Sequence, residues 1–397
     1  MAPPPPPRRP PALLDELVEE ILLRLPPDDP APLVRAGLVC KPWRRLVSDP
    51  GFRRRFRRFH RTPPMLGFLY MQGGTTCFEP TSSFCLPHAH CPTRWYAADV
   101  RHGRILFSDV TLTPPGKEFI VLNPMTGDAQ RLPMPQFEYD DFWAAAFLCA
   151  TLGCDHLDCP NGGPFTVVFL VTGEEFVSAW IYSSEAATWS ETTSVKLEDP
   201  EEFVLSGPIT LCRSALYFAC YDNTEVVEYS LGSRELSFIR LPPGCNASCG
   251  VLMIGEEGGL ELAMVHEFNL CIWLREDGPD GFAGWARRRV IELVSLLPAC
   301  ALSVPTFVIA GADGIGVIFV SRGNVLFTVD LKSLQVRKVL EGTQIYGIVP
   351  YMSFYTPALS AALQVRNQEG VPQMLNKYKI KKLLMKYGVR RLSAAAQ

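Results

Sequence analysis

Apolar residues near the start of the chain recur at helical spacing. Between residues 13 and 25, apolar residues recur with i, i+3, i+4 spacing: Leu13, Leu14, Leu17, Val18, Ile21, Leu22 and Leu25. This spacing lines one side of a helix with apolar side chains. Pro26 and Pro27 come next and cannot continue a helix. The pattern therefore predicts a first amphipathic helix that ends before these prolines.

Two further helices are predicted between residues 29 and 51. Asp29 and Pro30 suit the cap and first turn of a second helix. Pro42 suits the first turn of a third helix, which Asp49 and the two residues after it would end. The second helix is expected to bury four apolar residues: Leu33, Val34, Leu38 and Val39. Arginines that alternate with Phe52, Phe56 and Phe59 predict one more helical face after this bundle.

From Met65 to Pro357 the hydrophobic period changes from helical to alternating. Short runs such as 119–122, 165–171, 215–220 and 317–320 are apolar and rich in valine, isoleucine and phenylalanine. Such runs, bounded by turn residues, predict β-strands. This long region is therefore expected to be an all-β domain.

A hairpin-like unit recurs within the β region, at 121–133, 181–189, 227–242 and 329–339. Each copy has an apolar strand, a turn of Gly, Ser or Asn, and a returning strand. The first three copies lie roughly 45 to 60 residues apart, near the four-strand period of a propeller blade, and the fourth follows after about twice that distance. The repeat predicts six or seven blades with an unlocated seam, and a pair of β-sandwiches is the competing fold.

The helical segment contains three ordered motifs: Arg24-Leu25-Pro26, then Val39-Cys40-Lys41-Pro42-Trp43-Arg44, then Asp49-Pro50 and Phe52. Together they resemble an F-box. The resemblance implies docking to a Skp-family adaptor, and through it to the cullin and RING subunits of a ubiquitin ligase. Leu13-Leu14 departs from the Leu-Pro pair that usually opens the first helix. The alternative is a helical bundle that merely covers the next domain.

The resemblance nominates nine residues for contact with the adaptor. Some of them must instead hold the helices together, because a bundle this small has few apolar residues to spare. The candidates are Leu14, Leu17, Ile21, Leu25, Pro26, Leu33, Val39, Trp43 and Leu46.

The β region also resembles a known family. Asn123-Pro124-Met125-Thr126-Gly127 with Leu132-Pro133 is similar to the opening of the F-box-associated β region of plant F-box proteins, and 348–356 looks like the ending common in grass members. The expected organisation is α+β multidomain: a disordered proline-rich lead-in at 1–11, an F-box at 12–60, the propeller-like domain at 65–357, and a basic, partly helical tail at 358–397.

Composition narrows the function classes. The chain has 397 residues and a net charge of −3, which predicts no general affinity for nucleic acid or anionic membranes. Its longest apolar stretch, 142–152, is too short to cross a bilayer, and the start of the chain lacks a secretory h-region. The thirteen cysteines are then expected to be free thiols in the cytoplasm or nucleus.

Two clusters in the sequence contain cysteine and histidine, the residue types that bind zinc. They are Cys85, His88, His90 and Cys91, and Cys149, Cys154, His156 and Cys159. Neither has the paired Cys-x-x-Cys spacing of a zinc finger, so no metal is expected and loop thiols are favoured. Phosphate-loop, nucleophile-elbow and metalloprotease motifs are missing too, so neither a cofactor nor catalysis is expected.

These features together predict a non-catalytic substrate receptor of a Skp-cullin-F-box ubiquitin ligase. The F-box would bind the adaptor, and the β domain would present loops to an unidentified target protein. Acidic segments at 138–141 and 198–202 hint at a basic target. Two alternatives remain: an F-box scaffold that acts outside a ligase, and a propeller enzyme or lectin with a structural helical cap.

Overall fold

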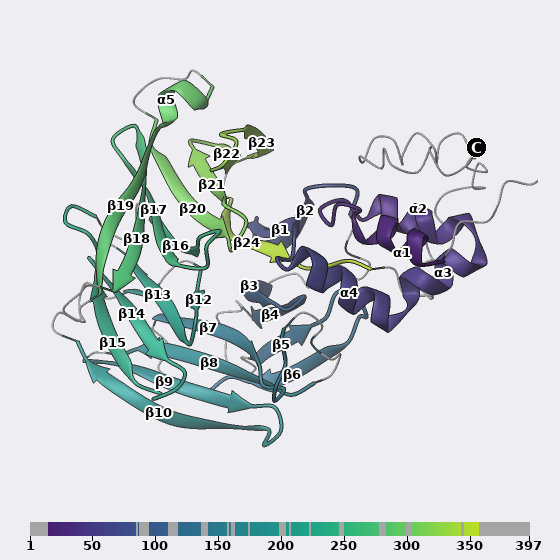
Figure 1. The fold of residues 1–397 in the computed structure, drawn as a ribbon. Coiled ribbons are helices and arrows are strands. Elements are labelled where there is room, and N and C mark those ends of the chain that lie inside the picture. The colour runs from purple at the N-terminus through teal and green to yellow at the C-terminus, as the bar shows by residue number, and fades with distance from the viewer. Residues whose placement is uncertain are drawn as a thin grey trace, which may run out of the picture. The chain divides into compact units, whose positions relative to one another are not determined.

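The computed structural model describes residues 15–356 with gaps (Figure 1). The gaps are 85, 87–94, 110–117, 136–141, 157–158, 160–162, 174, 198–203, 206–207, 222–223, 246–249, 278–282, 299–303 and 343–344. The proline-rich lead-in, Leu14, the basic tail, the first Cys/His group and both acidic segments lie outside the described residues.

The chain forms two compact units. One, here called the helical unit, combines 1–63 with 354–397, and the other, the propeller unit, spans 64–353. The described part of the helical unit therefore draws on both sides of the β region in sequence.

The helical unit has four helices where the hydrophobic pattern predicted a three-helix bundle. They are α1 (Asp15–Leu23), α2 (Ala31–Val39), α3 (Lys41–Ser48) and α4 (Pro50–His60). Asp49 ends α3, as expected, but it also starts α4, because its side chain accepts a hydrogen bond from the Phe52 backbone N at 2.9 Å. The arginine-rich segment is thus an integral helix of the unit.

One apolar core joins these helices. Phe52 and Phe56 of α4 are its largest fully buried side chains, and Phe354, from the segment after the β region, packs its ring edge-on against Phe56. The buried members of the core are Val18, Leu22, Leu23, Leu25, Leu33, Ala36, Val47, Phe52, Phe56 and Phe354.

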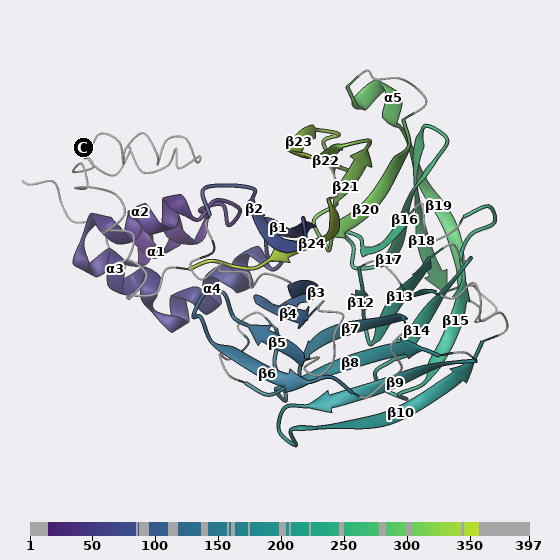
Figure 2. The same cartoon turned by 180° about the vertical axis from the view of Figure 1, so that it is seen from behind.

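The propeller unit consists of six antiparallel sheets, which confirms the all-β propeller and settles the blade number at six (Figures 1 and 2). The first three blades along the chain are β3 (Trp95–Arg101), β4 (Arg104–Asp109), β5 (Glu118–Leu122) and β6 (Ala129–Pro133); β7 (Phe142–Cys149), β8 (Phe165–Thr172), β9 (Phe176–Ser183) and β10 (Thr188–Lys196); and β11 (Val204–Leu205), β12 (Thr210–Cys212), β13 (Ala215–Tyr221), β14 (Glu225–Ser230) and β15 (Leu236–Arg240).

The remaining blades include the seam. They are β16 (Gly250–Ile254), β17 (Leu260–His266), β18 (Asn269–Asp277) and β19 (Ala283–Glu292); β20 (Thr306–Ala312), β21 (Val317–Arg322), β22 (Val325–Asp330) and β23 (Val336–Glu341); and β24 (Tyr346–Met352) with β1 (Met65–Gln72) and β2 (Thr75–Pro80). A short helix, α5 (Leu293–Leu296), follows β19.

The sixth blade closes the ring. Its inner strand β24 comes from the end of the β region and pairs antiparallel with β1 from its beginning, so that Leu69 faces Val349. Neighbouring blades contact each other through their inner strands all the way around the ring; at the third blade, β11 contacts β7 and β12 contacts β16. Closure therefore joins residues almost the full length of the propeller unit apart.

Apolar layers between neighbouring blades form the core of the propeller unit. One layer, for example, packs Phe119 of the first blade against Phe147 and Phe169 of the second. Another packs Val251 and Leu270 against Ile318 of the next blade. This packing explains the alternating sequence pattern, because each strand turns one set of side chains toward a neighbouring blade.

The recurring hairpin unit corresponds to the outer strands of four blades. Its copies fall on β5–β6, β9–β10, β14–β15 and β22–β23, each an antiparallel pair. The predicted hairpins are thus confirmed.

Candidate functional site

The helical unit exposes an apolar corner between α2 and α3. Residues 38–42, here called the α2–α3 corner, are all exposed, with Leu38 42% and Val39 38% accessible to solvent. The backbone of Cys40 is extended between the two helices, so the corner projects its side chains. The prediction that α2 buries Leu38 and Val39 is therefore wrong.

The structure divides the nine adaptor candidates by burial. Leu17 and Val39 are exposed, whereas Ile21, Pro26, Trp43 and Leu46 are half-buried. Leu25 and Leu33 are buried in the helical core, and Trp43 and Leu46 pack against that core. Leu14 lies outside the described residues. Contact of the set with an adaptor stays a prediction, and burial favours Leu17 and Val39 as direct contacts.

Leu38 and Cys40 are surface residues that the candidate set omits. Periodicity marks Leu38 as apolar but does not say which apolar positions of a short helix lack a covering neighbour. The motif that contains Cys40 was the available signal, because Pro42 opens the next helix and Cys40 therefore lies at the corner just after α2 ends.

The propeller unit contains a cavity of about 420 Å³ where the inner strands converge. Its lining combines apolar side chains such as Leu252 and Ile309 with the charged groups of Asp99, Arg101 and Asp313. A propeller enzyme or lectin needs a polar central channel that is ready to bind a ligand, so the hydrogen bonds and ion pairs of these three groups decide what the channel can do.

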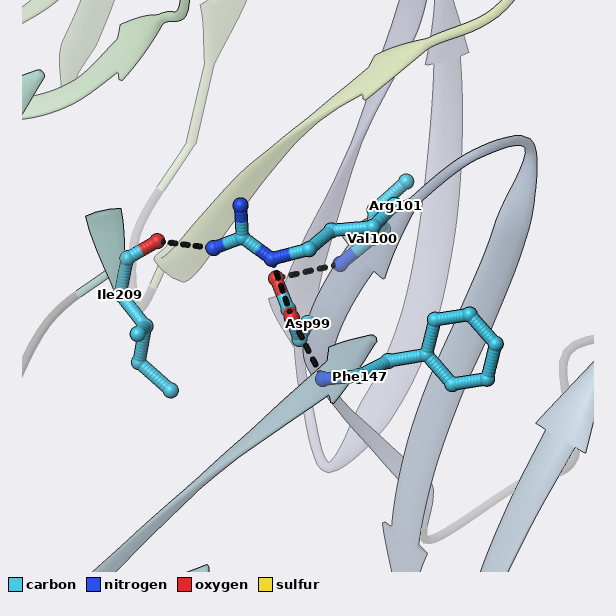
Figure 3. Close-up of polar contacts among 5 residues, drawn as sticks. All are labelled: Asp99, Val100, Arg101, Phe147 and Ile209. Carbon is cyan, nitrogen blue, oxygen red and sulfur yellow. Dashed lines mark hydrogen bonds and ion pairs between the residues drawn. The ribbon is translucent and has the colours of Figure 1, made fainter. Parts of the chain in front are cut away.

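Asp99 and Arg101 form a buried ion pair on β3 (Figure 3). Arg101 Nε donates to Asp99 Oδ2 at 2.8 Å, and its Nη2 donates to the Ile209 carbonyl, just before β12, at 2.6 Å. Asp99 also accepts hydrogen bonds from the backbone N of Phe147 on β7 at 2.8 Å and of Val100 at 2.9 Å. The pair thus connects three blades.

Similar side-chain bonds join other inner strands. Thr210 Oγ1 donates to the Leu252 carbonyl at 2.8 Å, and Asp313 Oδ1 accepts from the Ile254 backbone N at 2.9 Å. Burial raises the pKa of both Asp99 and Asp313 above the ordinary value for aspartate. The Arg101 guanidinium opposes this rise but does not cancel it. These polar groups hold the blades together, which favours a structural role over ligand chemistry for the channel.

The two ends of the propeller differ in their side chains and in chain connections. Ser353 N donates to the Pro64 carbonyl at 3.1 Å, so the chain enters and leaves the propeller unit at the end where each first strand turns into the second. The opposite end, here called the far face, carries the connections between blades. In the described propeller residues, every exposed phenylalanine or tyrosine side chain lies at the far face: Phe142, Phe176, Phe268, Phe307 and Tyr346.

Comparison with known families agrees with this architecture. The F-box domain matches residues 12–55, and the β-propeller of F-box protein AT5G49610-like matches residues 97–359, well over half of the chain. The chain belongs to the AT5G49610-like F-box β-propeller family. In this family member, the F-box match ends within α4 and includes the whole α2–α3 corner.

Similarity to individual proteins is weak. The nidogen/laminin complex matches at a TM-score of 0.42 and 12% identity over 71% of this chain and 97% of that chain. The periplasmic gluconolactonase PpgL of Pseudomonas aeruginosa matches at a TM-score of 0.39 and 13% identity over 70% and 82% of the two chains. No curated protein matches this F-box protein.

The helices of this F-box protein are short. Among the described residues, none is long and apolar enough to pass through a membrane.

Proposed function

We propose that this F-box protein is the substrate receptor of a Skp-cullin-F-box ubiquitin ligase, and that its α2–α3 corner is part of the adaptor contact. The observation that carries the proposal is the exposure of Leu38, Val39 and Cys40 within the segment that matches the F-box model. Burying a leucine side chain fully is worth about 1.5 to 3 kcal/mol, so a partner that covers this corner gains substantial affinity.

The helical unit would supply attachment, and the propeller unit would supply recognition. We place the target on the far face, because aromatic side chains are enriched at the centre of protein interfaces. Five exposed aromatic residues from four blades gather there. A target protein, rather than a small ligand, suits a surface spread over several blades.

Such a receptor requires no catalytic residue of its own. Holding a target lysine near a charged conjugating enzyme raises the effective concentration of the reacting groups. Buried free thiols such as Cys220, whose pKa burial raises to about 12, suit the reducing cytoplasm or nucleus in which this ligase would work.

The proposal is tested by assembling the ligase from the full-length chain, a Skp-family adaptor, a cullin and a RING subunit. We expect one stable complex on size exclusion, which a Leu17→Arg, Leu38→Arg variant fails to join although its circular dichroism is unchanged. Leu152→Arg is the matched control, because Leu152 is fully exposed in the propeller unit. A complex that forms equally well with the double variant would refute the contact.

Target recognition is tested separately by proximity labelling. A Phe176→Ser, Phe268→Ser variant should keep the adaptor and lose a set of proteins that wild type labels and that accumulate when the proteasome is inhibited. If wild type and this variant label the same proteins, the far face is not the target surface.

A further inference from the structure

A cluster of metal-ligand side chains lies at the connection between β7 and β8. Cys149 is the last residue of β7, and Cys154, His156 and Cys159 follow in the connection 150–164. The corresponding turn of the preceding blade contains only His102 and Gly103. Connections of about 12 to 15 residues or more are uncommon in compact domains and are often functional.

The four potential ligand atoms converge on one point. All lie within 4.8 Å of one another. Cys159 Sγ is 3.6 Å from Cys154 Sγ and 3.6 Å from His156 Nδ1. Zinc bonds of about 2.3 Å to sulfur and 2.0 to 2.1 Å to nitrogen place tetrahedral ligands roughly 3.4 to 3.8 Å apart. Both of these separations fall in that range.

The backbone bends to bring these side chains together. Gly153 and His156 both have a positive φ angle, of 67° and 56°. A positive φ is common for glycine but uncommon for a residue with a Cβ atom, such as His156. Cys154 N donates to the Thr151 carbonyl at 3.2 Å, which closes a tight turn just before the cluster. This uncommon backbone conformation at a ligand position indicates that contacts within the side-chain cluster determine the local conformation of the connection.

A disulfide accounts for less of this geometry. A bond between Cys154 and Cys159 requires their sulfurs to close from 3.6 Å to about 2.05 Å, and it leaves Cys149 and His156 without a role. Three thiols and an imidazole select zinc over magnesium or calcium, which prefer oxygen ligands.

We propose that Cys149, Cys154, His156 and Cys159 bind one structural Zn²⁺ ion. Four protein ligands fill a tetrahedral site and leave no position for a substrate, which is why the site is structural. The sequence expectation of no metal rested on spacing alone, and the fold brings together ligands that the spacing does not reveal. The proposal is independent of the ligase role.

The ion would fasten the second blade to the first. The His156 ring stacks on His102, in the β3–β4 turn, with centroids 4.6 Å apart, and Arg104 Nη1 contacts the Gly163 carbonyl at 3.4 Å. A metal that fixes the loop therefore also fixes a contact between the two blades at the end where the chain enters the propeller unit.

The test is the metal content of the full-length chain purified without chelator and measured by plasma mass spectrometry. We expect the Cys154→Ser, Cys159→Ser variant to hold about one zinc per chain less than wild type. Cys40→Ser, which changes an exposed cysteine far from the cluster in sequence, is the control and should match wild type. Replacing zinc with Co²⁺ should give a thiolate-to-cobalt absorption band in wild type that the double variant weakens.

Two outcomes would overturn the proposal. One is equal zinc content in folded wild type and the double variant, including after both are refolded with added zinc. The other is a Cys154–Cys159 disulfide found by peptide mass spectrometry in freshly purified wild type. Should the double variant fail to fold, His156→Ala, at an exposed position, gives the same comparison.

Discussion

Buried charges at the centre of the propeller unit act through the bonds they make between blades. The side chains of Asp99 and Arg101 are 7% and 10% exposed, and together they reach β7 and the residue before β12. Removing one partner of a buried ion pair leaves the other charge uncompensated, which is worse than removing both. Their contribution is therefore to the integrity of the ring.

We predict that Asp99→Ala lowers the free energy of unfolding of the propeller unit by about 3 kcal/mol, because it strands the Arg101 guanidinium and the Phe147 N–H. Urea denaturation followed by tryptophan fluorescence measures this. Asp128→Ala, in an exposed turn, should cost less than about 1 kcal/mol. Equal effects of the two substitutions would mean that the inter-blade bonds contribute little.

Residue types could be read from the sequence more easily than their surroundings. The F-box motif identified the right segment, yet Leu38 and Val39 were expected inside and lie outside. Helical periodicity reports which side of a helix is apolar, but which apolar residues are covered depends on where neighbouring helices end. The four proposed zinc ligands could also be recognised by residue type, but their convergence depends on the fold of the chain, which sequence spacing does not describe.

The helices of the F-box are joined at their ends as well as through their core. The His60 ring, in the last turn of α4, contacts the carbonyl of Leu23, the last residue of α1, at 2.9 Å, and it packs at a tilt against the Phe56 ring. Burial lowers the pKa of His60 below its ordinary value of 6.5, although the Leu23 and Leu25 carbonyls and Asp28 oppose this.

The lowered pKa predicts a loss of helical-unit stability in acid. The unfolded chain binds a proton on His60 more tightly than the folded unit does, so stability is full above pH 6.5 and falls as the pH drops below it. Hydrogen exchange of α1 and α4 amides, corrected for intrinsic rates, should reveal faster opening at about pH 5.5 than at about pH 7.5. His60→Gln should weaken this dependence, whereas His266→Gln, in the propeller unit, should leave it as in wild type.

Element types followed from the sequence better than element boundaries. Alternating apolar runs and turn residues located the strands and four outer hairpins, because each hairpin is a local structure. The sequence of the hairpin β18–β19 does not show the recurring hairpin unit. The seam pairs β24 with β1, which lie at opposite ends of the β region in sequence. Pairing between distant segments leaves no local pattern, so the blade number stayed at six or seven until the fold was known.

At the scale of the whole molecule, the helical unit is completed by a residue that lies after the propeller in sequence. Phe354 is 9% exposed in the helical core, although it directly follows Ser353, the last residue of the propeller unit. Sequence similarity placed the F-box within 12–60. The fold shows that these residues alone lack part of their own core.

We predict that Phe354→Ala destabilises the helical unit by about 3 kcal/mol, the cost of emptying a phenylalanine site in a core. Hydrogen exchange of α4 in the full-length chain reports this loss while exchange in the propeller unit stays unchanged. Phe59→Ala, at a position 52% exposed, is the matched control and should have little effect. Similar exchange in both variants would show that Phe354 is not needed by the F-box.

The central claim is that the exposed α2–α3 corner binds a Skp-family adaptor, and the most direct test is the dissociation constant of the purified full-length chain for that adaptor. Calorimetric titration should give tight binding by wild type and by Leu152→Arg. Leu38→Arg should bind about thirtyfold more weakly or worse, which corresponds to about 2 kcal/mol for a residue at the centre of an interface. The same dissociation constant for Leu38→Arg and wild type, or no binding by folded wild type, would contradict the account.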